Sequence, residues 1–287
     1  MNKRVQEFNE ILFAWNNNVY RPMDWRPKKR DTKVMLDPYR ILVSEIMLQQ
    51  TQVDRVRTKF AEFILRFPDV SMLARAPLRD VLRLWSGLGY NRRAKYLHQA
   101  AKAVVSEHDG KFPRDFTKLQ SLPGIGRSTA AAIMAFAWNE PYPMIDTNLR
   151  RILVRSFFDG DIPSDAVLFD FAQAMIPTGR GRAWNYAMLD LGAMVCTARR
   201  HSDACPMFDF HGDVDDFVYK KPQSKFKGSK RSYRGALLKA LVAEGTLSRK
   251  AAEAFFADTP YDGKAAIDEL LEEGILAKHK NNITLAE

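Results

Sequence analysis

The sequence predicts an all-α body followed by a small C-terminal module. Apolar residues recur at three- and four-residue spacing through most of the first 200 residues, which is the period of a helix that buries one face. Proline and glycine separate these segments at short intervals, and no alternating run in that region is long enough to propose a strand. Helices joined by short turns in this way indicate an all-α architecture.

The predicted helices of the body can be placed in order along the chain. In the first, Val5, Phe8 and Leu12 share one face, and Trp25 in the loop that follows is expected to anchor this arm. Pro68 and Pro77 mark turns, and one helix ends in a glycine-containing corner before Tyr90. Helices are expected over residues 1–22, 39–67 in two segments, 82–90, 92–108, 147–158, 164–176 and 182–195.

The C-terminal region changes character after the body. We expect the body to cover residues 1–212, a basic linker 213–232 and a separate module 233–287. Three helical patterns in the module precede two short apolar pairs that flank Asn281-Asn282, which is typical of a hairpin turn. Helices followed by a small β-wing indicate a winged-helix-like module, and a plain three-helix cap is the alternative.

Composition favours a polyanionic partner and gives no sign of a membrane protein. The chain has 287 residues and a net charge of +10, from 44 Lys and Arg against 34 Asp and Glu. The N-terminus is polar and no apolar stretch is long enough to span a bilayer, so no membrane partner is expected. Two cysteines do not make a disulfide framework. We therefore expect reduced thiols and a cytoplasmic location, nucleoid-associated if the source is a prokaryote.

The chain is organised around a glycine-rich turn between two helices, within residues 119–133. Pro123 ends the first helix, and Gly124 and Gly126 permit positive φ and a close approach of the backbone to a ligand. Arg127 and Ser128 then begin the second helix, where free backbone N–H groups and the helix dipole favour a phosphate. This arrangement indicates a grip on a nucleic-acid backbone, and an ordinary helix-to-helix turn is the alternative.

Two carboxylates are candidates for chemistry. Glu45 borders an apolar face in Ser-Glu-Ile-Met-Leu-Gln-Gln-Thr, residues 44–51, and a carboxyl at such a border has a raised pKa unless it is paired. A raised pKa suits a general acid. The alternative is that Glu45 is a solvated glutamate on the surface of a helix, with no part in catalysis. Asp146 precedes Thr147-Asn148 at the start of a helix, and by propensity alone it is an N-cap.

The motifs taken together resemble the helix-hairpin-helix DNA glycosylases and, among them, the MutY-type adenine DNA glycosylases. The resemblance covers roughly residues 20–200, with its motifs in the family's order, and such a set is far more specific than any single motif. It implies a two-lobed helix-hairpin-helix DNA glycosylase fold. The matching segments are Ser44–Thr51, Leu122–Gly126, Ile145–Asn148, Asp37–Tyr39, Trp85–Tyr90, Arg127–Thr129 and Asn185–Ala193.

The resemblance implies a role for each matched residue. Glu45 corresponds to the acid that protonates the flipped base and later handles water. Asp146 corresponds to the carboxylate that stabilises the sugar cation or bonds to it covalently. Asn148 is a polar partner near the sugar, and Tyr90 is an intercalating aromatic. The DNA-binding set that the resemblance implies is Leu48, Gln49, Gln50, Thr51, Leu122, Gly124, Ile125, Gly126, Arg127 and Ser128.

A few positions indicate which reaction the resemblance implies and which base is removed. Relatives that also nick the strand carry a lysine where this chain has Ser128, and serine cannot form the imine that strand cleavage needs. The resemblance therefore points to base removal alone. Arg26 and Tyr186 match positions of the base pocket, although relatives often have Glu or Gln in place of Tyr186, and Asn91 replaces a frequent tyrosine.

The cysteines depart from the family pattern. Most relatives hold an iron–sulfur cluster with four cysteines, but here only Cys196 matches, and Asp203, Pro206 and Gly212 take the other positions. Cys205 is one residue out of register. We expect no cluster and no metal; a zinc site from Cys196, His201, Cys205 and His211 is an alternative with uncommon spacing.

The function expected from the sequence is removal of mispaired adenine opposite guanine or 8-oxoguanine by a monomer that binds double-stranded DNA containing a mismatch. The C-terminal module is too short for the Nudix-like domain with which many relatives read 8-oxoguanine. A thymine or uracil mismatch glycosylase on the same fold is the main alternative. A non-catalytic DNA-binding protein is a second alternative, although binding alone needs neither Glu45 nor Asp146.

Overall fold

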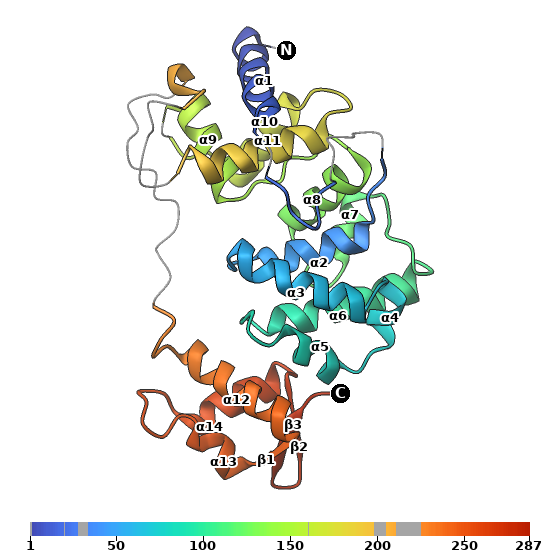
Figure 1. Cartoon of the computed structure of the whole chain (residues 1–287), viewed down its shortest axis with the longest axis vertical. Helices are drawn as coiled ribbons and strands as arrows, with labels where there is room; N and C mark the ends of the chain where they lie inside the picture. The colour runs from blue at the N-terminus through green and yellow to red at the C-terminus, as the bar shows by residue number, and fades with distance from the viewer. Residues whose placement is uncertain (1, 20, 28–33, 160, 198–204, 211–224) are drawn as a thin grey trace. The chain divides into compact units, whose positions relative to one another are not determined.

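The computed structural model describes residues 2–19, 21–27, 34–159, 161–197, 205–210 and 225–287 (Figure 1). The chain divides into two compact units, each assembled from separate stretches of sequence. Unit 1 comprises Met1–Ile41, Pro113–Ser121 and Ile125–Lys221. Unit 2 comprises Leu42–Phe112, Leu122–Gly124 and Pro222–Glu287.

The regular elements among the described residues of unit 1 are all helices, joined by loops. Its main apolar core joins α1 to α9, α10 and α11, with Phe8, Leu153 and Trp184 among the fully buried side chains. The Trp184 indole N–H donates to the Asn9 side-chain oxygen at 2.9 Å, which satisfies the only polar atom of the ring. Its elements are α1 (Lys3–Asn17), α7 (Phe116–Ser121), α8 (Arg127–Trp138), α9 (Thr147–Phe157), α10 (Asp165–Met175), α11 (Gly181–Met194) and the 3₁₀ helix η1 (Phe208–Phe210).

The alanine-rich helix α8 is buried along most of its length. Every residue from Thr129 to Ala137 is buried, and the helix packs against α7 and α11. Small side chains let helices approach closely, so the alanines allow α8 to pack tightly against α7 and α11. Trp25 is also buried, which confirms its expected role as an anchor.

The first part of unit 2 is a second set of packed helices. Phe63 packs edge-on against Phe67 and Trp85, at centroid distances of 5.1 Å and 6.2 Å. The helices are α2 (Pro38–Leu48), whose first turn belongs to unit 1, then α3 (Val53–Arg66), α4 (Val70–Arg75), α5 (Leu78–Trp85) and α6 (Arg92–Glu107). The sequence did not predict α4, because six residues between two prolines are too few to show a helical period.

The second part of unit 2 is the C-terminal module, residues 230–285. Its strands form one antiparallel sheet in the order β1-β3-β2, packed with three helices, so the winged-helix-like architecture is confirmed over a plain helical cap. The turn between β2 and β3 lies at Lys280-Asn281, one residue before the expected place. The elements are α12 (Lys230–Glu244), β1 (Thr246–Ser248), α13 (Arg249–Ala254), α14 (Gly263–Glu272), β2 (Leu276–His279) and β3 (Asn282–Leu285).

Most remaining predictions about elements are confirmed with shifted ends, but the helix expected over 82–90 is α5, Leu78–Trp85, so the prediction was wrong for residues 86–90, which form the corner before α6. The first helix ends at Asn17, not near residue 22, and the three helices after the hairpin each begin and end within about two residues of the prediction. The all-α expectation for the body holds in the described part of residues 1–200, where no strand occurs. Most of the expected linker, residues 213–224, lies outside the described residues. Among the helices that the structure describes, none is long and apolar enough to cross a bilayer.

Candidate active site

Asp146 is the N-cap of α9, and its backbone is extended as an N-cap requires. One carboxylate oxygen, Oδ1, accepts the backbone N–H groups of Asn148 and Leu149, each at 2.8 Å. The capping interpretation is therefore confirmed, and it fixes the orientation of the carboxylate at the positive end of a helix.

The environment of Asp146 disfavours its charge despite these hydrogen bonds. Burial raises the pKa of the carboxyl above its ordinary value of 3.8, while the N–H donors of Leu149 and Asn148 and the charge of Arg151 oppose the rise. A carboxylate with little water around it gains more from a nearby cation than a solvated one does. The position thus suits a group that must stabilise positive charge.

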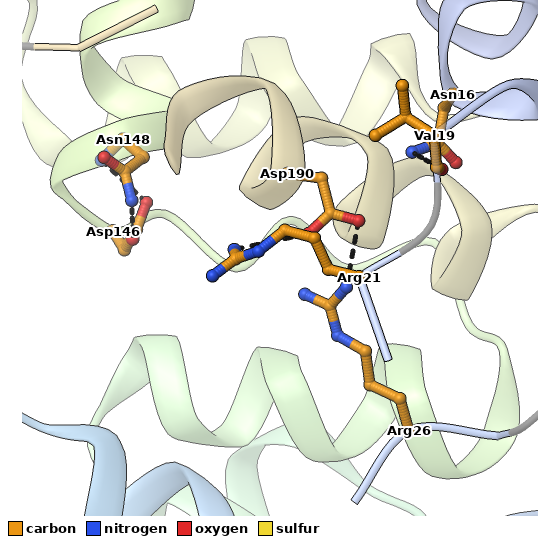
Figure 2. Close-up of polar contacts among 7 residues, drawn as sticks. All are labelled: Asn16, Val19, Arg21, Arg26, Asp146, Asn148 and Asp190. Carbon is orange, nitrogen blue, oxygen red and sulfur yellow. Dashed lines mark hydrogen bonds and ion pairs between the residues drawn. The ribbon is translucent and has the colours of Figure 1, made fainter. Parts of the chain in front are cut away.

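Asn148 links the second carboxylate oxygen to the rest of unit 1. Its side-chain N–H donates to Asp146 Oδ2 at 3.2 Å (Figure 2). Its side-chain oxygen accepts from Arg151 at 2.8 Å. Arg151 also donates to the backbone oxygens of Gly192, at 2.9 Å, and of Cys196, at 2.8 Å. Hydrogen bonds therefore run from α11 through Arg151 and Asn148 to Asp146.

Gly192 permits the close contact between α9 and α11 at this point. A Cβ atom on Gly192 would lie 2.5 Å from the Cβ of Asn148, far inside van der Waals contact. Only glycine fits this position of α11 without displacing Asn148, which is itself bonded to Asp146.

Glu45 lies in the middle of α2 and is buried, with 8% of its surface exposed. Its helical neighbours Ser44 and Ile46 are buried as well. The interpretation of Glu45 as a solvated surface residue is therefore wrong. A carboxyl kept largely from water is the state that a general acid needs.

The turn between α2 and α3 carries the residues expected to read DNA. Gln49 and Gln50 are exposed, and Leu48 and Thr51 are half-buried. Gln50 has φ of +56°, a left-handed conformation that is uncommon for a residue other than glycine. The turn is thus an outward corner with a backbone that must be held in place.

Arg93 holds this turn, and the sequence reasoning did not single it out. The guanidinium donates to the backbone oxygens of Ile46, at 2.9 Å, Met47, at 3.1 Å, and Gln49, and to the hydroxyl of Thr51, at 3.1 Å. Burial lowers the pKa of Arg93 to about 10, while the electrostatic effect of Tyr90 opposes the fall, so the Arg93 side chain stays cationic near neutral pH. An arginine in the first turn of an amphipathic helix gives no sequence signal of such a role.

Arg93 also supports the corner that presents Tyr90. It donates to the backbone oxygens of Leu88, at 3.1 Å, and Gly89, at 3.0 Å. Tyr90 has φ of +49°, and its ring centroid lies 5.4 Å from the Arg93 guanidinium. One buried cation thus organises the Tyr90 corner and the Gln49–Thr51 turn together.

The glycines of the hairpin differ in their conformations. Gly124 has φ of +73°, and a Cβ there would lie 2.5 Å from the Cβ of Tyr96, so both conformation and space require glycine. Gly126 does not adopt the positive φ that glycine permits. Gly126 is the N-cap of α8 with φ of −84° and ψ of 177°, because a helix begins after an extended residue. Its Cβ position faces open space, which leaves the backbone accessible.

The other hairpin residues divide into a buried and an exposed set. Leu122 and Ile125 are buried in the protein, so a contact of theirs with DNA would involve their backbone. Arg127 is exposed and its guanidinium lies 4.2 Å from the centroid of the Phe169 ring. Ser128 is half-buried in the first turn of α8.

Arg26 and Tyr186, the two expected pocket residues, contact each other. The Arg26 guanidinium lies 4.4 Å from the centroid of the Tyr186 ring, which stacks on Phe136 at 4.5 Å. Arg26 also donates to both oxygens of Asp190, at 2.8 Å and 2.9 Å, in a buried ion pair to which Arg21 adds a weaker contact at 3.5 Å (Figure 2). Asp190 was missed as a site residue, although it lies four residues after Tyr186 and therefore on the same face of α11.

The residues present do not fit an iron–sulfur cluster. Such a cluster needs four thiolates and the chain contains two cysteines. Cys196 and Cys205 are buried in the core of unit 1, and burial raises the pKa of the Cys205 thiol above 9.0. Pro206 offers no ligand atom, and Asp203, His201, His211 and Gly212 lie outside the described residues. Within the part of the chain that is described, no group of three or more His, Cys, Asp or Glu side chains is placed to hold a metal ion.

Known proteins share both sequence and fold with this chain. Residues 43–177 match the family described as HhH-GPD superfamily base excision DNA repair protein. The adenine DNA glycosylase of Mycolicibacterium smegmatis is 35% identical over 273 residues, which cover 92% of this chain and 91% of that protein. The human adenine DNA glycosylase is 37% identical over 211 residues, 71% of this chain and 38% of that protein.

Solved structures give the same fold. A thermostable thymine-DNA glycosylase superposes with a TM-score of 0.66 at 26% identity, covering 73% of this chain and 96% of that one. Endonuclease III in a non-covalent DNA complex superposes with a TM-score of 0.61 at 20% identity, covering 74% of this chain and 96% of that one. The described body is thus a helix-hairpin-helix glycosylase fold, and the full-length match shows that this chain belongs to the family of adenine DNA glycosylases.

Proposed function

We propose that the chain is a monofunctional DNA glycosylase of base excision repair, which removes adenine mispaired with guanine or 8-oxoguanine in double-stranded DNA. The observation that carries the chemistry is the Asp146 carboxylate, oriented at the start of α9 and poorly solvated. The choice of adenine rests on the relatives, which match over nearly the whole chain.

The reaction is hydrolysis of the bond between the base and sugar carbon C1′. Glu45 donates a proton to the ring nitrogen of the extruded base, so that the base leaves as a neutral molecule. Positive charge develops at C1′ and the ring oxygen, and the Asp146 carboxylate stabilises it. Water then adds to C1′ and gives a proton back to Glu45. Asn148 acts as a positioning residue because it bonds Asp146 Oδ2.

The target nucleotide has to leave the base stack before this chemistry. Tyr90 and the turn at Leu48, Gln49, Gln50 and Thr51 are proposed to wedge the duplex and to fill the space left behind. The left-handed backbone at Gln50 and Tyr90 supports this role, because strained, exposed corners held by a buried cation are characteristic of preorganised sites. The backbone N–H groups after Gly124 and Gly126, with Arg127, are proposed to bind the neighbouring phosphates.

The identity of residue 128 and the number of cysteines bear on strand cleavage and on an iron–sulfur cluster. Serine cannot form the imine through which related enzymes break the strand, so we propose base removal without strand cleavage. We propose that the protein works without an iron–sulfur cluster, since it lacks two of the four thiols. We also propose that it acts as a monomer in the cytoplasm, associated with the nucleoid if the source is a prokaryote.

Arg26 and Tyr186 are proposed to line the base pocket, with Asp190 holding Arg26 in place. Tyr186 stacks on Phe136 and contacts the Arg26 guanidinium, and these contacts hold the half-buried Tyr186 ring in one position, which supports its proposed role as a wall for the base.

A duplex panel tests the proposal. Adenine, thymine or uracil is placed opposite guanine or 8-oxoguanine, and base release is followed under single turnover. We expect adenine release from the wild type, no release by Asp146→Asn or Glu45→Gln, and similar duplex affinity in all. Release of thymine or uracil alone would favour the alternative suggested by the thymine-DNA glycosylase neighbour. Binding without any release would support a non-catalytic DNA-binding protein.

A further inference from the structure

The C-terminal module contacts Tyr90 directly through Arg231. Arg231 lies in the first turn of α12, and its Nη1 donates to the Tyr90 hydroxyl oxygen. The same guanidinium carbon lies 5.4 Å from the centroid of the Tyr90 ring, as does that of Arg93. Tyr90 therefore contacts two cations, one from α6 and one from the module.

The module is attached to the helices of unit 2 at other places. Lys95 Nζ donates to the backbone oxygen of Glu273 at 2.6 Å, and Arg79 pairs with Glu287 at 2.9 Å. Helix α5 also packs against α12 and β3. Because several contacts hold the module, the Arg231 contact is not required merely to keep it in place.

The cationic side chains next to Arg231 in α12 form ion pairs within the module. Lys230 pairs with Glu269 at 2.6 Å, and Arg234 pairs with Glu273 and Glu269 of the α14 region. Arg231 instead bonds a residue of the body. The same turn of α12 thus contains cations that stabilise the module and one that contacts the corner after α5.

The Tyr90 corner needs support at two points. Gly87 and Gly89 both have positive φ, and their Cβ positions face open space, so packing around them does not fix the corner. Arg93 fixes the backbone that leads to Tyr90 through the oxygens of Leu88 and Gly89. The hydroxyl end of the side chain is fixed by Arg231.

We propose that Arg231 is a positioning residue for base flipping: it holds the Tyr90 side chain in the orientation from which the ring enters the duplex. The C-terminal module is then part of the flipping machinery of this short adenine glycosylase. The inference rests on the proposed function, in which Tyr90 is the wedge.

The test measures base flipping separately from excision. A duplex carries 2-aminopurine beside the target adenine opposite 8-oxoguanine, and stopped-flow fluorescence follows unstacking while single-turnover assays follow release. We expect Arg231→Ala to slow unstacking about tenfold, the effect of losing one hydrogen bond to a charged group, with duplex affinity almost unchanged. Arg231→Lys retains a donor and a cation, and we expect it to restore most of the rate.

A control variant separates this role from loss of charge. Lys239 is exposed on the same helix, so Lys239→Ala removes one positive charge from the module without touching the corner, and we expect the wild-type rate. Thermal unfolding of both variants checks that the module stays folded. In a double-mutant cycle with Tyr90→Phe, which removes the hydroxyl, Arg231→Ala should cost much less than it does alone.

Each contrary result has a definite meaning. Equal unstacking in Arg231→Ala and Lys239→Ala, faster unstacking in Arg231→Ala, or additive effects with Tyr90→Phe would each overturn the role of Arg231. If Tyr90→Ala unstacks the duplex as fast as the wild type, the wedge in the proposed function fails as well. If Tyr90→Ala is slow and Arg231→Ala is normal, only the present inference fails.

Discussion

At the scale of single residues, the site is governed by carboxylates that are shielded from water to different degrees and held by hydrogen bonds. Asp146 is kept in place by the backbone N–H groups of α9 and by Asn148, yet burial raises its pKa. Asp190, with 2% of its surface exposed, is paired with Arg26. The raised pKa means that charged Asp146 costs folding free energy that a surface aspartate would not, which is common where chemistry is done.

The first prediction is that Asp146→Asn stabilises the protein near neutral pH. The folded state binds the Asp146 proton more tightly than the unfolded state does, so stability falls as pH rises from about 3.8 through the raised pKa. Asparagine still caps the helix and does not titrate. The melting temperature of the variant relative to wild type should therefore increase over that pH range.

A matched control exists for this measurement. Asp262 caps α14 through the N–H groups of Lys264 and Ala265, as Asp146 caps α9, but it is exposed. Asp262→Asn should show no comparable gain. If Asp146→Asn is less stable than wild type at every pH, then the hydrogen bonds and Arg151 outweigh burial, and the account of this carboxylate is wrong.

The second prediction concerns the buried ion pair between Arg26 and Asp190. Asp190→Asn keeps the shape of the side chain but leaves the buried Arg26 without its counter-ion, and it should lower the free energy of unfolding by about 3–5 kcal/mol. Adenine release should fall with it, because Arg26 no longer has a fixed position over Tyr186. Denaturant unfolding and single-turnover release measure the two effects.

Arg21 supplies the comparison for that variant. It reaches the same carboxylate at 3.5 Å and is 28% exposed, so Arg21→Ala should cost less than about 1 kcal/mol. An equal loss in Arg21→Ala and Asp190→Asn would show that the Arg26 pair has no special weight.

At the scale of elements, the site depends on how closely α9 and α11 approach. Gly192 lies where the two helices meet, and Arg151 bonds its backbone oxygen. The position of Asp146 is therefore set by the fit between two helices as well as by its own turn.

The third prediction is that Gly192→Ala displaces Asn148. Its Cβ would lie 2.5 Å from the Asn148 Cβ and 3.1 Å from its Cγ, so the start of α9 has to shift. We expect a loss of about 1–3 kcal/mol in unfolding free energy and slower release at unchanged duplex affinity. Gly235→Ala is the control: it lies in α12 with open space around it, and should add about 0.5–1 kcal/mol. Full release activity in Gly192→Ala would show that Asn148 does not position Asp146.

Local sequence signals predicted the elements better than the contacts between them. The period of apolar residues, Pro123 with its glycines, and the Asp146 cap each act within a few residues, and the structure confirms the helices and the cap they indicate. Arg93 acts on backbone oxygens as far as 47 residues away, and such a hydrogen bond leaves no pattern in the sequence. Short elements such as α4 and β1 are also too brief for a period to show.

At the scale of the whole molecule, segments distant in the sequence are fastened by arginine side chains. Arg4 of α1 donates to the backbone oxygens of Ser156, at 2.8 Å, and Phe210, at 3.4 Å. Arg151 and Arg155 reach residues 196 and 197 from α9. These bonds hold the end of the body where relatives are expected to bind a cluster. The resemblance predicted the position of this region at Cys196 and Cys205. The sequence could not predict the arginine hydrogen bonds, because they join residues far apart in the chain.

The fourth prediction follows from the proposal that the protein works without a cluster and that these arginine bonds hold this end of the body. Buried thiols, one with a raised pKa, and guanidinium bonds to nearby backbone oxygens need no ion to hold them. The purified protein should therefore lack the visible absorbance of an iron–sulfur cluster, and a strong chelator should leave its melting temperature and adenine release unchanged. Elemental analysis should find less than stoichiometric iron and zinc. Stoichiometric metal whose removal lowers stability would mean that residues 198–204 or 211–224 contribute ligands, and that arginine bonds alone do not hold this end of unit 1.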